Sequence, residues 1–353
     1  MNKEQLSQAQ ALGRHGFRKR LLWLMLASAL ALAAMASLTI GRFPVSLSKV
    51  ISLLASHVIP VNILWSETDA RVVELIRLPR ITMAILTGAG LGIAGASLQG
   101  VFRNPLVGPQ IIGVSSGASF GGVLAILLFE NHFWTMGFAF VFGLLAVLIV
   151  YAMGRVRGRS PVLTLVLAGI VTSAFFSALV SLVKYTADPY DKLPAIVFWL
   201  MGSLATVTHQ KLCIASVPVI TAGLVLLLMA FRLNVLSLGD EEAAAMGVKV
   251  ERDRVIILVC VTAITSSLVA VCGVIGWVGL VVPHIGRMLA GPDHRVLLPV
   301  SGLLGGLYLL LIDDLARALT PSEIPIGIIT AVIGAPIFGY LLRKTHANGW
   351  DGA

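Results

Sequence analysis

Long apolar stretches alternate along the chain with short breaks that contain charged residues, proline or glycine. A helix that crosses a bilayer needs roughly 20 predominantly apolar residues, and ten stretches come near that length. The pattern therefore predicts an all-α integral membrane fold with about ten transmembrane helices. The predicted spans are residues 21–40, 81–101, 110–129, 134–153, 162–186, 212–231, 255–272, 274–290, 297–315 and 324–342.

The segments between these spans are too short to hold a soluble domain. The longest are an outer segment, 41–80, and an inner loop, 232–254. We therefore expect a single transmembrane permease-like domain over residues 21–343, with cytoplasmic tails at 1–20 and 344–353.

The first span must be distinguished from a secretory signal peptide. It follows Arg18-Lys19-Arg20, and Ala34-Met35-Ala36 resembles a cleavage site. Its apolar run is about 20 residues long, however, whereas a signal core typically has 7–15. An uncleaved anchor helix is therefore the favoured interpretation.

Composition excludes several classes of protein. Of the 353 residues, 57% are hydrophobic and only 12% are charged, whereas about one-quarter of a soluble domain is charged. A soluble enzyme, a disordered chain and a nucleic-acid-binding domain are excluded. The net charge of +9 does not suggest nucleic acid as a partner, because the charges lie in short stretches between apolar runs and form no basic face. Membrane lipid is the expected surrounding.

The distribution of lysine and arginine predicts the orientation. If the N-terminus is cytoplasmic and ten spans alternate, 17 of the 26 basic residues fall in inner segments. Cytoplasmic segments carry such an excess in membrane proteins. Both termini are therefore expected in the cytoplasm. The basic residues left outside include Arg77, Arg80 and Arg317.

Several chemical signatures do not occur in the sequence. There is no G-x-x-x-x-G-K-[ST] motif for ATP and no H-E-x-x-H motif for zinc. Cys213, Cys260 and Cys272 lie within or at the edge of apolar runs without C-x-x-C spacing, which predicts small buried hydrophobic side chains. We expect no cofactor or metal on this chain.

Ionisable residues are almost lacking inside the spans, and Asp313 and Asp314 lie near the outer end of the ninth. Ion-coupled carriers usually have buried carboxylates or histidines along their path. A secondary transporter is therefore the less favoured alternative, and an intramembrane enzyme would lack a catalytic dyad.

Small residues recur at helical spacing in three spans. Gly88, Gly92 and Gly95 share one side of the second span, and Gly117 and Gly121 repeat the spacing in the third. Ala331, Ala335 and Gly339 do so in the last span. Such spacing lets helix backbones approach closely in lipid, so these faces are expected to be packing seams.

The inner loop 232–254 is predicted to contain a short acidic helix. Asp240, Glu241 and Glu242 would form its first turn, which suits the positive end of a helix, and Asp240 is a candidate N-cap. Gly247 is placed to end it. The helix is either a simple feature of the loop or a rigid contact for a soluble partner.

Motifs along the chain resemble those of permease subunits of binding-protein-dependent ABC importers, in the branch that carries iron–siderophore complexes, haem and vitamin B12. Glu242-Ala243-Ala244-x-x-Gly247 is similar to their coupling-helix signature. Other matching stretches, in family order, are Arg77–Arg80, Asn104-Pro105-Leu106, 113–118, Phe198–Ser203, Ile275–Arg287, Asp293-His294-Arg295 and 323–327. The chain departs from the family at Leu106-Val107-Gly108-Pro109, which lacks the usual acidic residue.

The resemblance implies ten spans in the plasma or inner membrane of a bacterium or archaeon. It also implies a second permease copy (a homodimer or a pseudo-dimer with a similar chain), two ATPase subunits inside and a substrate-binding protein outside. ATP and Mg²⁺ would bind to the ATPase subunits. The expected cargo is a metal chelate, with a ferric siderophore favoured, haem or cobalamin next, and an oxyanion such as molybdate as the alternative.

The resemblance also assigns roles to residues. Coupling to the ATPase would involve Asp240, Glu241, Glu242, Ala243, Ala244 and Gly247. Docking of the binding protein would involve Arg77, Arg80 and Arg317. The pathway and its inner gate would involve Val162, Leu163, Thr164, Ser173, Ser177 and Ser181.

Structural alternatives exist for two of these sets. Arg77 and Arg80 would equally suit interfacial residues whose charged ends extend to the membrane surface, and Arg317 could pair with Asp313 or Asp314 in its own chain. The serines could bond to carbonyls of the preceding helical turn.

Overall fold

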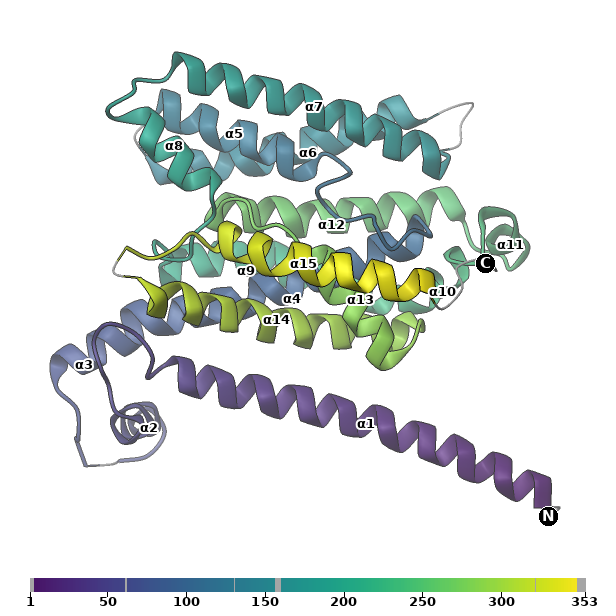
Figure 1. Cartoon of the computed structure of the whole chain (residues 1–353), viewed down its shortest axis with the longest axis horizontal. Helices are drawn as coiled ribbons and strands as arrows, with labels where there is room; N and C mark the ends of the chain where they lie inside the picture. The colour runs from purple at the N-terminus through teal and green to yellow at the C-terminus, as the bar shows by residue number, and fades with distance from the viewer. Residues whose placement is uncertain (1–2, 61, 130, 156–159, 321, 348–353) are drawn as a thin grey trace.

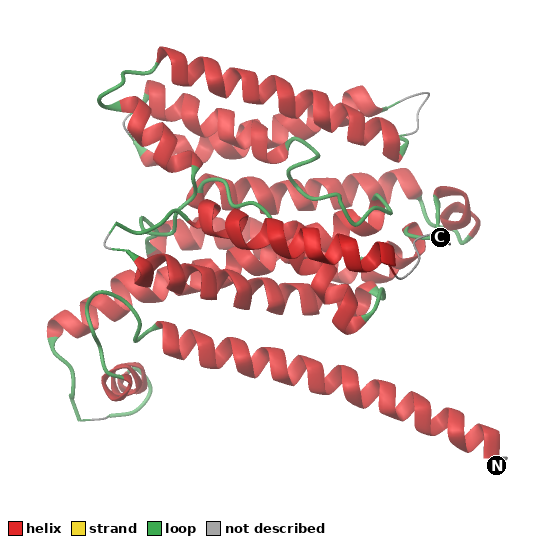
Figure 2. Ribbon diagram, in the orientation of Figure 1, coloured by secondary structure: helices red, strands yellow, loops and turns green. Residues whose placement is uncertain are grey.

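The computed structural model describes residues 3–60, 62–129, 131–155, 160–320 and 322–347. Over these residues the chain is helical, with no strand (Figure 2). The elements are α1 (Lys3–Ser37), α2 (Leu47–Ser56), α3 (Glu67–Arg71), the π-helical turn η1 (Val72–Arg77), α4 (Leu78–Val101), α5 (Val114–Leu128), α6 (His132–Gly154), α7 (Val162–Thr186), α8 (Lys192–Leu200), α9 (His209–Leu228), α10 (Ala230–Leu236), α11 (Asp240–Ala245), α12 (Val250–Cys272), α13 (Val278–Ala290), α14 (His294–Leu319) and α15 (Ile326–Ala347).

Each predicted span corresponds to one helix, but not all of these helices are long enough to cross a membrane. Within the described residues, seven helices meet the length and apolarity that a crossing needs. The helices α5 and α13 have only 15 and 13 residues. Their starts, predicted near 110 and 274, are late because the residues directly before them, Gly113 and Trp277, have positive φ angles of 79° and 67°, which do not fit an α-helix. The count of about ten crossings stays a prediction.

The outer segment is more helical than its polarity suggests. The helices α3, η1 and α4 form one continuous 35-residue helix from Glu67 to Val101. It starts with a capping box, in which the Ser66 hydroxyl accepts from the amide of Asp69 and the Asp69 carboxylate accepts from the amide of Ser66. Arg77 and Arg80 therefore lie inside a helix and not in a loop. The first helix is also longer than predicted, because α1 already begins at Lys3, within the segment predicted as a cytoplasmic tail.

The centre of the bundle is formed by α4, α12 and α14. Between 61% and 78% of the 18-residue apolar stretch in each of these helices is buried, compared with 28% in α6 and α9 and 6% in α1. Glycine allows this closeness, because a Cβ at Gly88 or Gly92 would collide with backbone carbonyls of α14, and one at Gly95 with a carbonyl of α13. The predicted seam of the second span is confirmed.

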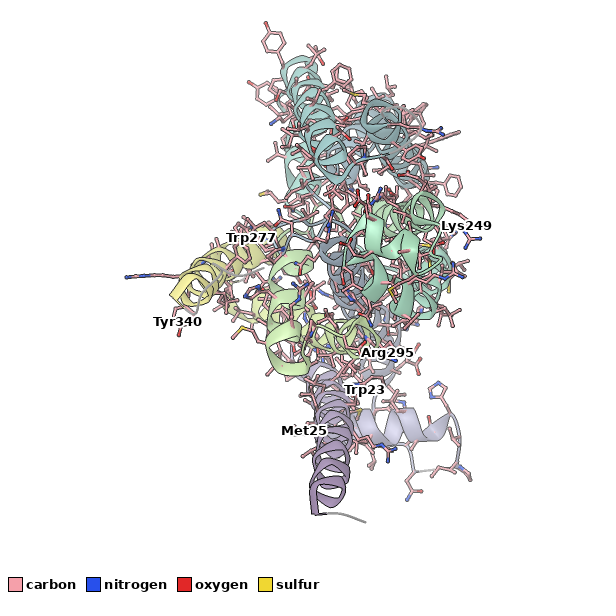
Figure 3. All side chains as sticks on the ribbon, turned by 90° about the vertical axis from the view of Figure 1, so that its right-hand side faces the viewer. Trp23, Met25, Lys249, Trp277, Arg295 and Tyr340 are labelled. Atoms are coloured by element: carbon pink, nitrogen blue, oxygen red, sulfur yellow. The ribbon has the colours of Figure 1, made fainter. Side chains whose placement is uncertain are left out.

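The seam of the third span is confirmed as well, whereas Gly339 of the last span has no close neighbour among the described residues. A Cβ at Gly117 or Gly121 would collide with carbonyls of α6, but one at Gly339 would meet no atom within 4 Å. Figure 3 shows α15, which carries Tyr340, standing apart from the main group of helices.

The two ends of the bundle carry different elements. The start of α1, the end of α15 and α11 lie at the right of Figure 1, and α2, α3 and α8 at the left. We call these the inner and outer ends, following the predicted orientation. Cys260 and Cys272 are buried as predicted, but Cys213 is exposed, because its face of α9 turns away from the bundle.

Candidate functional site

The short helix α11 projects from the inner end between two glycines. Gly239 precedes it with a φ of 143° and Gly247 follows it with a φ of 81°, conformations that favour glycine. Gly247 thus ends the helix as predicted. The predicted capping role of Asp240 is wrong, because Gly239 occupies the cap position and the Asp240 carboxylate instead accepts a 2.7 Å bond from Arg254.

The surface of α11 is suited to contact another protein. Ala243 is fully buried and anchors the helix, whereas Glu241, Glu242 and Ala244 are exposed. Met246 beside them is 59% exposed. The helix therefore presents carboxylates and an apolar side chain together, which is a surface that a soluble partner can bind.

The predicted coupling residues and part of the predicted inner gate share one groove. A cavity of about 610 Å³ separates α11 from the start of α7, and Asp240, Glu241, Glu242, Val162 and Leu163 line it. Arg103 and Asn104, from the segment after α4, line it too. Thr164 is held differently, because its hydroxyl donates to the carbonyls of Gly154 and Pro161, both at 2.8 Å.

At the outer end, the three predicted docking arginines are internal. Arg77, Arg80 and Arg317 are only 4%, 5% and 7% exposed. Arg80 lies 2.9 Å from Asp313 and donates to Glu323 at 3.0 Å. Arg317 pairs with Asp313 at 3.2 Å and also bonds Asp314.

The remaining donors of this cluster hold the end of α1. The guanidinium of Arg317 donates to Ser37 at 2.7 Å and to the carbonyl of Ile40 at 3.0 Å. Arg77 donates to the carbonyls of Leu38, at 2.6 Å, and Phe43. The outer arginines thus fasten the chain that follows α1 to α4 and α14.

Docking by these three arginines stays a prediction, and this arrangement sets a condition on it. Because the guanidinium donors already have partners in their own chain, acidic residues of another protein would have to displace those partners first. The alternative that Arg317 pairs with Asp313 and Asp314 is confirmed. Glu323 and Ser37 were missed, because nothing in their local sequence indicates partners about 240 and 280 residues away.

Part of the predicted serine face of α7 lines a second cavity. Ser177 and Ser181 border a space of about 430 Å³ toward the outer end, together with Ser115, Ser116 and Ser119 of α5. Gln110 and Lys184 complete its polar lining. Ser173 lies outside the lining, and its hydroxyl donates to the carbonyl of Gln110 at 3.4 Å. Ser181 also bonds the Ser177 carbonyl at 3.0 Å, as the structural alternative predicts.

The α5 serines were missed as site residues, although the signal was present. Ser115 and Ser116 belong to the stretch 113–118, which we used only as a mark of family resemblance, and Ser119 follows directly after it. Their hydroxyls and those of α7 form one wall that can bind polar groups weakly. In the described part of the chain, no group of three His, Cys, Asp or Glu side chains lies close enough to hold a metal ion.

Comparison with known proteins identifies the family. Residues 8–344 match the FecCD transport family. The chain is 44% identical to a molybdate import system permease protein of Haemophilus influenzae, over 91% of this chain and 95% of that one. It is 43% identical to an iron chelatin transport system permease protein of Helicobacter pylori, over 77% and 82%.

A solved structure has the same architecture. It is described as an inward-facing conformation of a metal-chelate type ABC transporter, with a TM-score of 0.83 and 42% identity, and the match covers 92% of this chain and 99% of that one. The chain belongs to the FecCD transport family and is a multi-pass permease subunit of an ABC importer in the inner membrane.

Proposed function

We propose that this permease carries a metal chelate, with a ferric siderophore as the favoured cargo and haem or cobalamin next. A substrate-binding protein would deliver it at the outer end, and two ATPase subunits would drive transport from the inner end. The observation that carries the proposal is the position of α11, which presents its acidic surface beside the start of α7 across one groove.

A second permease copy would complete the pathway. The helices α7 and α15 have apolar side chains that the described residues leave uncovered, among them Leu167 at 53%, Phe175 at 57% and Val332 at 67% exposure. The open seam at Gly339 supports close approach of another helix. We infer that these faces meet their counterparts at a two-fold axis, in a homodimer or with a similar chain.

The exposed face of α7 suits a bulky cargo that must not be held tightly. It combines hydroxyls at Ser177 and Ser181 with apolar side chains, and these can contact the organic shell of a chelate weakly. The same hydroxyls, with Lys184, also suit an oxyanion. Molybdate is therefore the second candidate, supported by the cargo named for the relative from Haemophilus influenzae.

Reconstitution tests the proposal. The permease, its ATPase subunits and its binding protein would be placed in vesicles and offered ferric siderophores, haem, cobalamin and molybdate. We expect ATP-dependent uptake of a ferric siderophore. Uptake of molybdate alone would instead identify an oxyanion as the cargo. Uptake that persists without the ATPase subunits under a proton or sodium gradient would instead indicate a secondary transporter.

A further inference from the structure

Arg254, in the first turns of α12, is the largest side chain that is fully buried in the described structure. It is 1% exposed and lies just behind α11 at the inner end. A buried guanidinium is expensive to desolvate and is retained where its bonds hold specific groups in place.

The bonds of Arg254 connect two elements that are otherwise apart. Its Nη2 donates to Asp240 of α11 at 2.7 Å, and its Nη1 donates to the carbonyl of Ser160 at 2.8 Å. Ser160 is fully buried and lies two residues before α7 begins. One planar guanidinium thus joins the predicted coupling helix to the entrance of the predicted gate helix.

Glu251 stiffens this connection from one turn earlier on α12. Its Oε1 accepts from Arg254 at 3.2 Å and from the amide of Ser160 at 2.9 Å, and its Oε2 accepts from the Ser160 hydroxyl. Ser160 is therefore held through its amide, hydroxyl and carbonyl at once. Any shift of Arg254 must move Ser160 with it.

The connection continues into α7. Pro161 follows Ser160, and its fixed φ limits the freedom of the link. The carbonyl of Pro161 accepts from the hydroxyl of Thr164 at 2.8 Å in the first turn of α7. A displacement at Ser160 is thereby passed to the turn that carries Val162 and Leu163.

The groove next to this link shows why it is needed. The cavity of about 610 Å³ keeps α11 and α7 from packing directly against one another along its length. Motion of α11 would not reach α7 by side-chain contact across open space. The bonds of Arg254 cross behind the groove.

We propose that Arg254 is a positioning residue that transmits displacement of α11 to the start of α7. The inference rests on the proposed function, because it requires α11 to be moved by ATPase subunits. Two neighbouring arginines provide matched controls. Arg232 and Arg252 both bond Asp253, at 3.0 and 3.1 Å, and they are 46% and 54% exposed.

The first experiment measures coupling in the complete transporter in vesicles, with Arg254→Gln, Arg254→Lys and the control Arg252→Gln. For Arg254→Gln we expect retained assembly with the ATPase subunits and retained hydrolysis, with roughly tenfold less cargo transported per ATP. The cargo transported per ATP by Arg254→Lys should fall between the values for the unmodified chain and for Arg254→Gln, because an ammonium is a single point charge without a planar fork. Arg252→Gln should behave as the unmodified chain.

The second experiment does not depend on the stability of Arg254 variants. Asp240→Ala removes the α11 end of the link, and spin labels at Ala245 and Leu163, both exposed, report the distance between α11 and α7. In the unmodified transporter α11 and α7 should move together between nucleotide states, so the distance between the labels should stay nearly constant. In Asp240→Ala, α11 should move while α7 stays, so this distance should change.

The outcomes separate this proposal from the proposed function. If Arg254→Lys and Asp240→Ala both transport as much cargo per ATP as Arg252→Gln, Arg254 does not transmit the motion. A loss of transport that only follows a loss of assembly in every variant would overturn it as well. Failure of the unmodified chain and of Arg252→Gln to transport with ATP would instead refute the proposed function.

Discussion

Arg80, Asp313 and Arg317 form a row of ion pairs in which each residue is at most 7% exposed. A charge so deeply buried is tolerable only while its partner is present. The row joins α4 to α14 and, through Ser37 and Asp314, to the end of α1. These residues therefore stabilise the outer end of the bundle.

The first prediction concerns this row. Asp313→Asn should lower the free energy of unfolding by about 3 kcal/mol or more, because Arg80 and Arg317 lose their shared carboxylate. Thermal unfolding in detergent would measure it. Arg71→Gln is the control, since Arg71 and Glu67 form an exposed pair of 71% and 80% accessibility, worth about 0–1 kcal/mol. Equal losses in the two variants would contradict the assignment.

Single residues also show what sequence reasoning could and could not reach. Gly247 and the seam glycines were predictable, because positive φ and close helix contacts demand residues without a side chain. The start of the second span at Glu67 was within reach too, since Ser66 and Asp69 have capping-box spacing. The pairing of Arg80 with Asp313 was not, because it depends on which distant helices pack together.

At the scale of elements, α11 is the part whose chemistry is easiest to test. The side chains of Glu241 and Glu242 are exposed, whereas buried Ala243 anchors the helix. A change on the exposed side should therefore affect partner binding and spare insertion.

The second prediction follows from that division. Glu242→Arg should leave the permease inserted at normal levels but reduce co-purification of the ATPase subunits and transport roughly tenfold, because a charged contact at the interface is reversed. Glu67→Arg, at an exposed position of the outer end, is the control. Normal co-purification and transport in Glu242→Arg would exclude α11 as the coupling site.

The helix α7 has one buried side and one uncovered side. Thr172 is 2% exposed, whereas Ser177 and Ser181 are exposed at the hydroxyl-lined cavity. Hydropathy alone cannot separate the two sides, because the whole helix is apolar. The serine spacing predicted a cavity-lining position correctly for Ser177 and Ser181 only, and their role in a pathway stays a prediction.

The third prediction uses this contrast. In a chain whose cysteines are replaced, including exposed Cys213, a cysteine at position 177 or 181 should react with a water-soluble thiol reagent added from the outer side. Thr172→Cys should not react, since it is nearly isosteric and buried. Labelling that is equal at 172 and 177, or absent at 177 in every nucleotide state, would remove this face from the pathway.

The outer end of the molecule carries exposed arginines in addition to the buried ones. Arg42 and Arg71 are exposed near α2 and α3, at the outer end. They are better placed than Arg77, Arg80 or Arg317 to meet acidic residues of a binding protein. Sequence position alone does not distinguish these two groups, because all five residues lie in predicted outer segments.

The fourth prediction concerns these exposed arginines. The double change Arg42→Glu and Arg71→Glu should slow association of the binding protein several-fold at low salt, and less at high salt, because exposed charges steer encounter and are screened by ions. Surface plasmon resonance on the permease in nanodiscs would measure the rate. Arg155→Glu, exposed at the inner end, is the control. An unchanged rate at low salt would return attention to the internal arginines.

The helix α1 is the least enclosed of the crossing helices, with 6% of its apolar window buried. Along most of its length its neighbours are acyl chains, which accept any apolar side chain of suitable size. Selection should therefore act on its length and apolarity rather than on individual identities. In a saturation mutagenesis screen, tolerance should be broad through the helix and fall sharply at Ser37, where the bonds to Asp314 and Arg317 begin.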